Sequence, residues 1–257
     1  MRRFGLLFVY VFVPFVVLAQ GHRGVDEPPL NMSQLEMPVI RSADIVLVYD
    51  GFVVGYNSKY LIPNWVAYEL TESEVAGQVP RAKGFSMDPD YKDSQAMRED
   101  YSNSGWDKGH MAPSADMKWS PKAMYESFYL TNICPQNHDL NGKDWHTLEK
   151  YVRDWALKYG TVWVVCGPYV STNTYGTIGE QQVTVPDGFF KAVLRKEGND
   201  YKSIAFLFEN SSARQPVQGA MVSVNYVEAL LGFDLFFNLN DLIEETVESQ
   251  TNWEEWN

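Results

Sequence analysis

Two short motifs constrain the fold of this chain more than any other feature of its sequence. The first is Asp107-Lys108-Gly109-His110, which continues as Met111-Ala112-Pro113-Ser114-Ala115. The second starts at Thr131-Asn132-Ile133-Cys134-Pro135-Gln136 and is followed by Asp139-Leu140-Asn141 and by residues 145–149. A lone tetrapeptide is a weak signal, but two blocks in a fixed order and spacing are a strong one.

The two blocks resemble the active site of the sugar-nonspecific, endonuclease G-like enzymes, the DNA/RNA non-specific endonuclease family. The family signature usually has Arg where this chain has Lys108. Flanking segments, from Tyr49-Asp50-Gly51-Phe52 to Leu231-Gly232-Phe233-Asp234, extend the resemblance over residues 42–247. The resemblance implies a ββα-metal fold, in which a hairpin carrying His110 packs against the helix near Asn141.

The sequence pattern predicts an α+β domain with a central mixed or antiparallel sheet and flanking helices. Asp50-Gly51 predicts a hairpin over residues 45–56, and apolar runs predict strands over 65–70, 127–134, 162–166 and 203–208. Residues 183–185 and 189–194 are predicted to form a second hairpin. Helical spacing predicts helices over 145–159 and 223–231, each ended by a glycine. Strands and helices do not alternate as βαβ units, which favours α+β.

The N-terminus predicts export. A positive start, Met1-Arg2-Arg3, precedes an apolar run over residues 4–18, and small residues before Gln20 offer a cleavage site. The alternative is a membrane anchor, but the run is shorter than the roughly 20 residues that span a bilayer. We therefore expect a secreted or periplasmic protein with no stable membrane association.

The predicted organisation is a signal peptide over residues 1–20, an extended lead-in over 21–41, the endonuclease domain over 42–247 and a solvated acidic tail over 248–257. Export would permit a disulfide between Cys134 and Cys166. The alternative is two buried, unpaired thiols that pack as small apolar side chains.

The net charge of −12 is unusual for a protein that binds nucleic acid, because basic patches normally provide phosphate affinity. The charge is unevenly distributed. Residues 241–257 hold six acidic residues and no basic one, whereas residues 81–160 hold eleven Lys or Arg against twelve Asp or Glu. A bound divalent cation would add positive charge at the site. We expect weak long-range attraction to nucleic acid and strong salt sensitivity.

His110 is the candidate general base. Phosphodiester hydrolysis needs an activated water, a cation on the phosphate and help for the leaving 3′-oxygen. An imidazole with a pKa near 6.5 can take a proton from water around neutral pH. His22, His138 and His146 lie outside the motif, and we interpret them as ordinary surface or core residues.

The resemblance implies that Asn141 binds Mg²⁺, with Mn²⁺ as the alternative ion. Mg²⁺ prefers oxygen ligands and keeps several waters, so one neutral protein ligand is consistent with it. The alternative is an Asn that caps a helix beginning near Asp144. Glu149 lies roughly 12 Å further along that helix, and the resemblance assigns it a role through the waters of the metal. Its alternative is an exposed ion pair with Arg153.

Arg81 and Lys108 are predicted to contact phosphate. Arg81 matches the upstream arginine of the family, and a planar guanidinium suits the spreading charge of the transition state. Lys108 keeps the charge of the usual arginine but lacks its bidentate fork. Asn132 matches a family asparagine near the site, and we expect it to have a positional role. Asp107 is expected to be a structural hydrogen-bond acceptor.

The N-terminus predicts a secreted protein, and the resemblance implies a Mg²⁺-dependent endonuclease that cleaves DNA and RNA and leaves 5′-phosphate ends. Low sequence specificity is expected because none of the assigned groups needs to touch a base edge. The alternative is a catalytically impaired nucleic-acid-binding module on the same scaffold. Lys108 and the acidic charge favour that alternative, and the intact set of His110, Asn141, Glu149 and Arg81 argues against it. A zinc hydrolase is disfavoured because the chain has no HExxH motif. A homodimer fits the family, and the sequence identifies no inhibitor protein.

Overall fold

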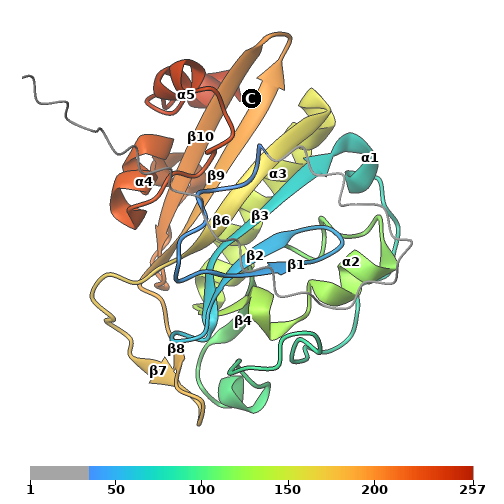
Figure 1. Cartoon of the computed structure of the whole chain (residues 1–257), viewed down its shortest axis with the longest axis vertical. Helices are drawn as coiled ribbons and strands as arrows, with labels where there is room; N and C mark the ends of the chain where they lie inside the picture. Colours follow the sequence, from blue (N-terminus) through green and yellow to red (C-terminus); the bar gives the residue numbers. More distant parts are fainter. Residues whose placement is uncertain (1–34, 257) are drawn as a thin grey trace, which may run out of the picture.

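The chain folds around one antiparallel sheet, as the computed structural model of residues 35–256 shows (Figure 1). Each neighbouring pair of strands in this sheet is antiparallel. In spatial order the strands are β1 (Ile45–Val48), β2 (Val53–Asn57), β3 (Ile62–Thr71), β6 (Thr161–Tyr169), β9 (Gly188–Glu197), β10 (Asp200–Glu209) and β11 (Met221–Val222). The predicted α+β class is confirmed, with an antiparallel rather than a mixed sheet.

Two short strand pairs lie outside the central sheet. They are β4 (Asp107–His110) with β5 (Ile133–Gln136), and β7 (Thr177–Ile178) with β8 (Val183–Thr184). The helices are α1 (Glu72–Val75), α2 (Pro121–Glu126), α3 (His146–Tyr159), α4 (Val224–Leu231) and α5 (Asp241–Val247). A π-helix (Leu140–Trp145) leads directly into α3, and short 3₁₀ turns occur at Glu99–Tyr101, Leu130–Asn132, Val217–Ala220 and Trp253–Glu255.

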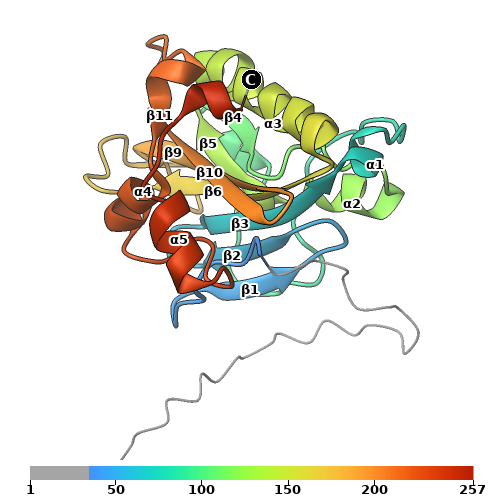
Figure 2. The same ribbon diagram turned by 90° about the horizontal axis from the view of Figure 1, so that it is seen from above.

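The central sheet is buried on both faces. Figure 2 shows α3 and the β4–β5 pair on one side of the sheet and α4 and α5 on the other. Side chains of β3 alternate between these two cores, as the pleat of a strand requires. Val66 and Tyr68 point into the core on the α3 side, whereas Trp65 and Ala67 point into the core on the α4 and α5 side. The α3-side core carries the candidate site.

The predicted hairpin over residues 45–56 and the two helices predicted to end at a glycine are confirmed. The hairpin of β1 and β2 closes with a hydrogen bond from Tyr49 N–H to Phe52 O of 2.9 Å. Helix α3 ends at Gly160, which has a φ of 85° that favours glycine. Helix α4 begins at Ser223, whose side chain accepts from the Tyr226 N–H, and it ends at Gly232.

Two predictions about strands are wrong. The predicted buried strand over 127–134 is instead a 3₁₀ turn at Leu130–Asn132 followed by β5, which pairs with β4 outside the central sheet. The predicted hairpin of 183–185 with 189–194 does not form, because β8 pairs with β7 and β9 pairs with β6 and β10. Asp187 between them accepts backbone hydrogen bonds from Ser171 and Thr172. That carboxylate fixes a distant loop rather than a hairpin turn.

The acidic tail is exposed over residues 249–252 but packed at its described end. Trp256 is 1% exposed and packs against Trp155 at 4.7 Å between ring centroids. The Glu255 carbonyl oxygen accepts from Arg195 at 2.9 Å, which holds the tail on the sheet. The acidic residues of the tail therefore belong to a segment whose Trp256 side chain packs into the core on the α3 side. The boundaries of the predicted domain stay predictions.

The described end of the predicted lead-in is packed rather than extended into solvent. Leu35 and Met37 contact the core beneath α4 and α5, and Val39 N–H donates to Asp234 O at 2.9 Å. The predicted signal peptide, residues 1–20, lies outside the described residues. Within residues 35–256, no helix has the length and apolar character needed to cross a bilayer.

Both cysteines are buried and unpaired, so the alternative to a disulfide holds. Cys134 lies on β5 and Cys166 on β6 of the central sheet. The Cys166 thiol donates to Met111 O at 3.3 Å, directly after the first motif. Burial raises the pKa of Cys166 to about 11, which keeps it a neutral thiol.

Candidate active site

The two sequence motifs meet as the paired strands β4 and β5. His110 lies opposite Ile133, and Asp107 lies opposite Gln136. Successive side chains of a strand point to opposite faces, so Lys108 and His110 share one face of β4. Gly109 lies between them on the other face, where an added Cβ would come within 2.1 Å of Gln136 Oε1. The motif needs glycine there because the side chain of Gln136 fills the space that a Cβ would occupy.

His110 lies in an aromatic enclosure. The ring is 8% exposed, and its centroid is 5.2 Å from Phe85 and 4.9 Å from Phe128. Burial, with a smaller contribution from the positive charge of Arg81, lowers the pKa of His110 to about 3. The imidazole is therefore neutral at physiological pH, and Nε2 has no hydrogen-bond partner within the described protein.

Arg81 lies beside His110. Its guanidinium donates to Ser114 Oγ, and Cζ is 5.0 Å from the centroid of the Phe128 ring. Ser114 belongs to the segment that follows His110, so this hydrogen bond ties Arg81 to the first motif. The positive charge of Arg81 also opposes the rise in the pKa of Glu149 that burial causes. The structure thus brings His110 and Glu149 each within electrostatic range of Arg81.

Lys108 lies on the same face of β4 and is held by aromatic rings. Nζ is 5.0 Å from the centroid of Tyr101 and 5.9 Å from that of Phe85. Burial and the nearby charge of Arg98 lower the pKa of Lys108. Cation–π contacts leave an ammonium able to donate to an anion. The position of Lys108 therefore suits contact with a phosphate next to His110.

Asn141 is oriented by Asp107. The Asn141 Nδ2 donates to Asp107 Oδ2 at 2.9 Å, and the same oxygen is 3.0 Å from Nδ1 of His138. With its amide nitrogen fixed on Asp107, Asn141 directs Oδ1 away from that carboxylate. Asp107 is thus the structural acceptor that the sequence predicted. His138, interpreted as an ordinary residue, belongs to the same cluster.

Asn141 does not cap a helix, so the capping alternative is wrong. It lies inside the π-helix, and its backbone N–H donates to Asn137 O at 2.9 Å. The side chain of Asn137 instead accepts from the N–H of Asp139 at 3.0 Å. A π-turn is wider than an α-turn and is frequent at functional sites. Here the helix begins several residues before the predicted start near Asp144.

Glu149 lies on α3 and is half-buried. Burial raises the pKa of Glu149 to about 7, against the opposing charges of Lys191, Arg153 and Arg81. The predicted alternative, an exposed ion pair with Arg153, is not the arrangement found. Arg153 Nη1 donates to Asp116 Oδ1 at 2.8 Å instead.

Asn132 holds the backbone that follows His110. Its Oδ1 accepts from Ala112 N–H at 2.9 Å, and its Nδ2 donates to Ala112 O at 3.0 Å and Ser127 O at 2.9 Å. The side chain is fully buried and its hydrogen-bonding groups are engaged. Asn132 therefore positions the loop after β4 and has no free group for a phosphate.

A layer of charged side chains beneath the site was not predicted. Asp116 and Lys191 are fully buried between the sheet and α3, and Tyr68 donates to Asp116 Oδ2 at 3.0 Å. The available signal was Lys191 itself, a lone charge inside the apolar strand Phe189-Phe190-Lys191-Ala192-Val193. Asp116 carries no comparable signal, because it follows a proline-containing loop that also fits an exposed residue.

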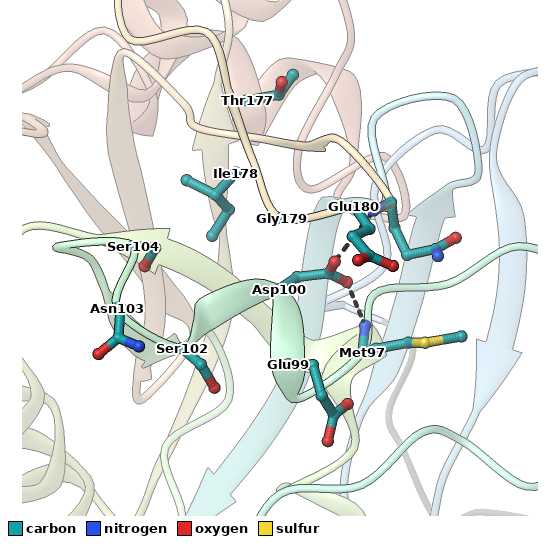
Figure 3. Close-up of a pocket in the computed structure, with 11 residues that line it drawn as sticks. Met97, Glu99, Asp100, Ser102, Asn103, Ser104, Thr177, Ile178, Gly179 and Glu180 are labelled. Carbon is teal, nitrogen blue, oxygen red and sulfur yellow. Dashed lines mark hydrogen bonds between the residues drawn. The ribbon is translucent and has the colours of Figure 1, made fainter.

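A surface pocket of about 450 Å³ lies apart from these residues (Figure 3). Asp100 forms part of its wall and accepts from the N–H groups of Met97 at 2.7 Å and Gln181 at 3.0 Å. The pocket also exposes the carboxylates of Glu99 and Glu180, which would repel a phosphate. None of the predicted site residues lines it, so we assign the chemistry to the face of β4.

Comparisons with known proteins extend these observations. A model of the family described as DNA/RNA non-specific endonuclease matches residues 33–242. Mitochondrial nuclease EXOG of Danio rerio is 37% identical over 168 residues, which cover 61% of this chain and 49% of the relative. Human mitochondrial endonuclease G is 30% identical over 197 residues, covering 71% and 66%. Nuclease C1 of Cunninghamella echinulata var. echinulata is 31% identical over 208 residues, covering 74% and 82%.

A solved structure of EndoG in complex with EndoGI, concerned with EndoG inhibition, has the same fold. Its TM-score is 0.72 at 28% sequence identity, over 78% of this chain and 89% of that one. This likeness confirms the predicted ββα-metal fold. The chain spans about half the length of the EXOG relatives that it matches.

The predicted secreted or periplasmic location is wrong on these comparisons. The EXOG relatives and human endonuclease G are named as mitochondrial nucleases, which contradicts the prediction of export. The apolar N-terminal run that prompted the prediction lies outside the described residues.

Proposed function

The chain belongs to the DNA/RNA non-specific endonuclease family, and from this membership we propose that it is a metal-dependent endonuclease hydrolysing phosphodiester bonds of DNA and RNA. His110 is the general base, and Arg81 and Lys108 stabilise the charge of the phosphate. Asn141 holds a divalent cation, Mg²⁺ or alternatively Mn²⁺. Glu149 acts on the waters of that ion, and Asn132 positions the loop that follows the base.

The observation that carries this proposal is the state of His110. Nε2 of His110 lacks a protein partner in the described structure, and the imidazole lies on β4 close enough to Arg81 for the guanidinium to affect its pKa. A histidine kept only for packing would gain stability from satisfying that nitrogen. The free nitrogen next to a guanidinium instead suits a base that serves a water molecule beside an anion.

The side chains near Asn141 fit a magnesium ion. Asp107 holds the amide nitrogen of Asn141, which leaves its oxygen as a neutral ligand. Among residues 35–256 no group of three or more His, Cys, Asp or Glu is arranged to hold a metal. A single amide oxygen suits Mg²⁺, which keeps several waters and takes phosphate oxygens as ligands. When bound, the ion would supply positive charge to the phosphate and the leaving oxygen.

The chemistry of the chain's own residues follows from their positions. His110 takes a proton from water, whose oxygen forms a new bond to phosphorus while the bond to the 3′-oxygen breaks. The product then carries a 5′-phosphate, and water protonates the released 3′-oxygen. Arg81 and Lys108 stabilise the negative charge that spreads over the phosphate oxygens. Base edges take no part in these contacts, which suits a nuclease without sequence specificity.

The test is cleavage of plasmid DNA and of structured RNA by the purified protein at low salt. We expect both substrates to be degraded in Mg²⁺ and to survive in EDTA, with activity restored when Mg²⁺ is added back. A folded wild-type chain that binds nucleic acid without cleaving it in Mg²⁺ or Mn²⁺ would favour the impaired binding module instead.

A further inference from the structure

Asn210 is a fully buried polar side chain at the end of the central sheet. It follows β10 directly, is 0% exposed, and both groups of its amide form hydrogen bonds to backbone atoms. Oδ1 accepts from Asn137 N–H at 2.7 Å, and Nδ2 donates to Pro135 O at 3.1 Å and to Pro186 O at 2.9 Å. A buried amide is costly unless its groups are satisfied in this way. Asn210 therefore joins its own strand to two segments that lie far from it in the sequence.

One of these hydrogen bonds leads to Asn141. Asn137, whose N–H donates to Asn210, directly precedes the helical segment that contains Asn141. The carbonyl oxygen of Asn137 accepts from Asn141 N–H at 2.9 Å, and its side-chain oxygen accepts from Asp139 N–H at 3.0 Å. Asn210 thus reaches the backbone of Asn141 through a single intervening residue.

The other end of this link is anchored in the sheet. Asn210 N–H donates to Asp187 O at 2.9 Å, and Glu209, the residue before it, pairs with Gly188 on β9. The Asp187 carboxylate in turn accepts from the N–H of Ser171 at 2.8 Å. The central sheet and its connecting loops therefore set the position of Asn210.

The loop that follows Asn210 holds the far end of the same segment. Asp144 lies inside the π-helix, three residues after Asn141. One of its carboxylate oxygens accepts from Arg214 Nη2 at 2.8 Å, and the other accepts from Gln215 N–H at 2.8 Å. The residues before and after Asn141 are thus both attached to one loop, residues 210–215.

Packing alone does not fix the turn that carries Asn141. Leu140 and Trp145 are buried, but Asn141 is only partly buried, and Gly142 and Lys143 are exposed. An exposed turn with few apolar contacts opens easily unless hydrogen bonds restrain it. The attachments to residues 210–215 supply that restraint.

We propose that Asn210 is a positioning residue of the active site, which holds the backbone of Asn141 in place through Asn137. The role rests on the proposed function, because the place of Asn141 matters through the divalent cation that it holds. Asp107 orients the side-chain amide of Asn141, whereas Asn210 fixes the backbone that carries this amide. Asn210 is fully buried, so it acts through Asn137 and does not contact nucleic acid.

The first test needs neither metal nor activity. We would measure backbone hydrogen exchange by mass spectrometry for metal-free wild type, Asn210→Ala and a control variant, Ser203→Ala. Residues 137–145 should exchange about tenfold faster or more in Asn210→Ala, the effect of leaving a buried N–H without its acceptor. A wild-type rate in Asn210→Ala, or an equal increase in the control, would overturn the proposal.

Ser203→Ala is the matched control for a general loss of stability. Ser203 lies on the same strand and is 5% exposed. Its Oγ donates to Val247 O at 2.9 Å, in the core on the α4 and α5 side of the sheet. The control therefore also removes a buried hydrogen bond of β10, but on the face away from α3. We expect residues 137–145 to exchange at the wild-type rate in this variant.

Asn210→Asp keeps the test decisive if Asn210→Ala does not fold. An aspartate keeps an acceptor oxygen for Asn137 N–H and loses the amide donor to Pro135 O and Pro186 O. Because the link to Asn141 runs through the acceptor, the proposal predicts nearly wild-type exchange over residues 137–145 in this variant. Clearly faster exchange there than in wild type would contradict it.

The second test is the Mg²⁺ concentration that gives half-maximal cleavage of plasmid DNA. Asn210→Ala should raise this concentration by about tenfold or more and recover most of its rate at saturating Mg²⁺, whereas Ser203→Ala should leave it unchanged. An unchanged Mg²⁺ requirement in Asn210→Ala would overturn the proposal. Wild type that does not cleave would instead refute the proposed function, and the exchange measurement would still decide whether Asn210 holds residues 137–145.

Discussion

Asp107 accepts a hydrogen bond of 2.9 Å from the side-chain amide of Asn141, joining the first strand of the active site to the helix that follows the second. The two residues are 34 positions apart in the chain. Asp107 is the start of β4, which carries His110 at its other end. One carboxylate thereby sets both the orientation of the proposed metal ligand and its place relative to the base.

Substituting Asp107 by Ala should weaken metal activation without unfolding the protein. The Asn141 amide would lose the acceptor that orients it, and removal of such a partner commonly costs about 10- to 100-fold in metal affinity or activity. The measurement is the Mg²⁺ concentration that gives half-maximal cleavage. His138→Ala is the control, since it leaves the hydrogen bond between Asp107 and Asn141 intact. An unchanged Mg²⁺ requirement in Asp107→Ala would show that Asp107 does not orient the metal ligand.

Substituting Asn132 by Ala should act mainly on stability. The change leaves the buried N–H and O of Ala112 and the O of Ser127 without their partners. We expect a loss of about 2–3 kcal/mol in the free energy of unfolding, measured by urea denaturation. Asn199→Ala, in the exposed turn after β9, is the control. Full stability with lost cleavage would mean that Asn132 contacts the substrate.

His110 should make the folded protein sensitive to acid. Its pKa is about 3 when folded and near 6.5 when unfolded, so between these values only the unfolded chain binds the proton. Stability therefore falls as the pH decreases through this window, by up to about 1.4 kcal/mol per pH unit. Glu149 contributes with the opposite sign and is present in both proteins compared.

The check is urea unfolding of wild type and His110→Gln at pH 6, 5 and 4. Wild type should lose stability more steeply than the variant over this range. Parallel curves would show that the imidazole is not held neutral by the fold.

Lys108 should contribute a phosphate contact that arginine can replace. Lys108→Ala should reduce the slope of log affinity against log salt concentration by about 0.9 for double-stranded DNA, the value for one phosphate contact. Lys108→Arg should keep the wild-type slope. Binding is measured by fluorescence anisotropy in the cleavage-deficient His110→Ala background. A slope that Lys108→Ala does not change would place Lys108 away from the phosphates.

The elements predicted correctly are those whose turn residues and hydrophobic periodicity lie within one short stretch of sequence. The hairpin around Asp50-Gly51 and the helix that ends at Gly160 carry their turn residues and their periodicity within a dozen positions. The resemblance likewise predicted that the strand pair carrying His110 packs against the helix near Asn141, where Asp107 and Asn141 are hydrogen-bonded. The roles of the site residues stay predictions. The pairing of β8 was missed because a strand's partner is set by the sheet as a whole.

The sequence also did not predict which charged side chains pair when the two partners lie far apart in the chain. Arg153 has a carboxylate one helical turn away in Glu149, yet it bonds Asp116 because the fold places that residue beneath α3. The tail is rich in acidic residues, but the burial of Trp256 against Trp155 outweighs their preference for water. In both cases a tertiary contact overrides the local pattern.

The central claim is that His110 is the base of a metal-dependent phosphodiester hydrolysis. The most direct measurement is the rate of plasmid cleavage in Mg²⁺ by wild type and His110→Ala, each first shown to be folded by circular dichroism. We predict a fall of at least about a hundredfold in the variant, the lower range of a general-base effect, with no activity in EDTA for either protein. Cleavage by His110→Ala at nearly the wild-type rate would contradict the account.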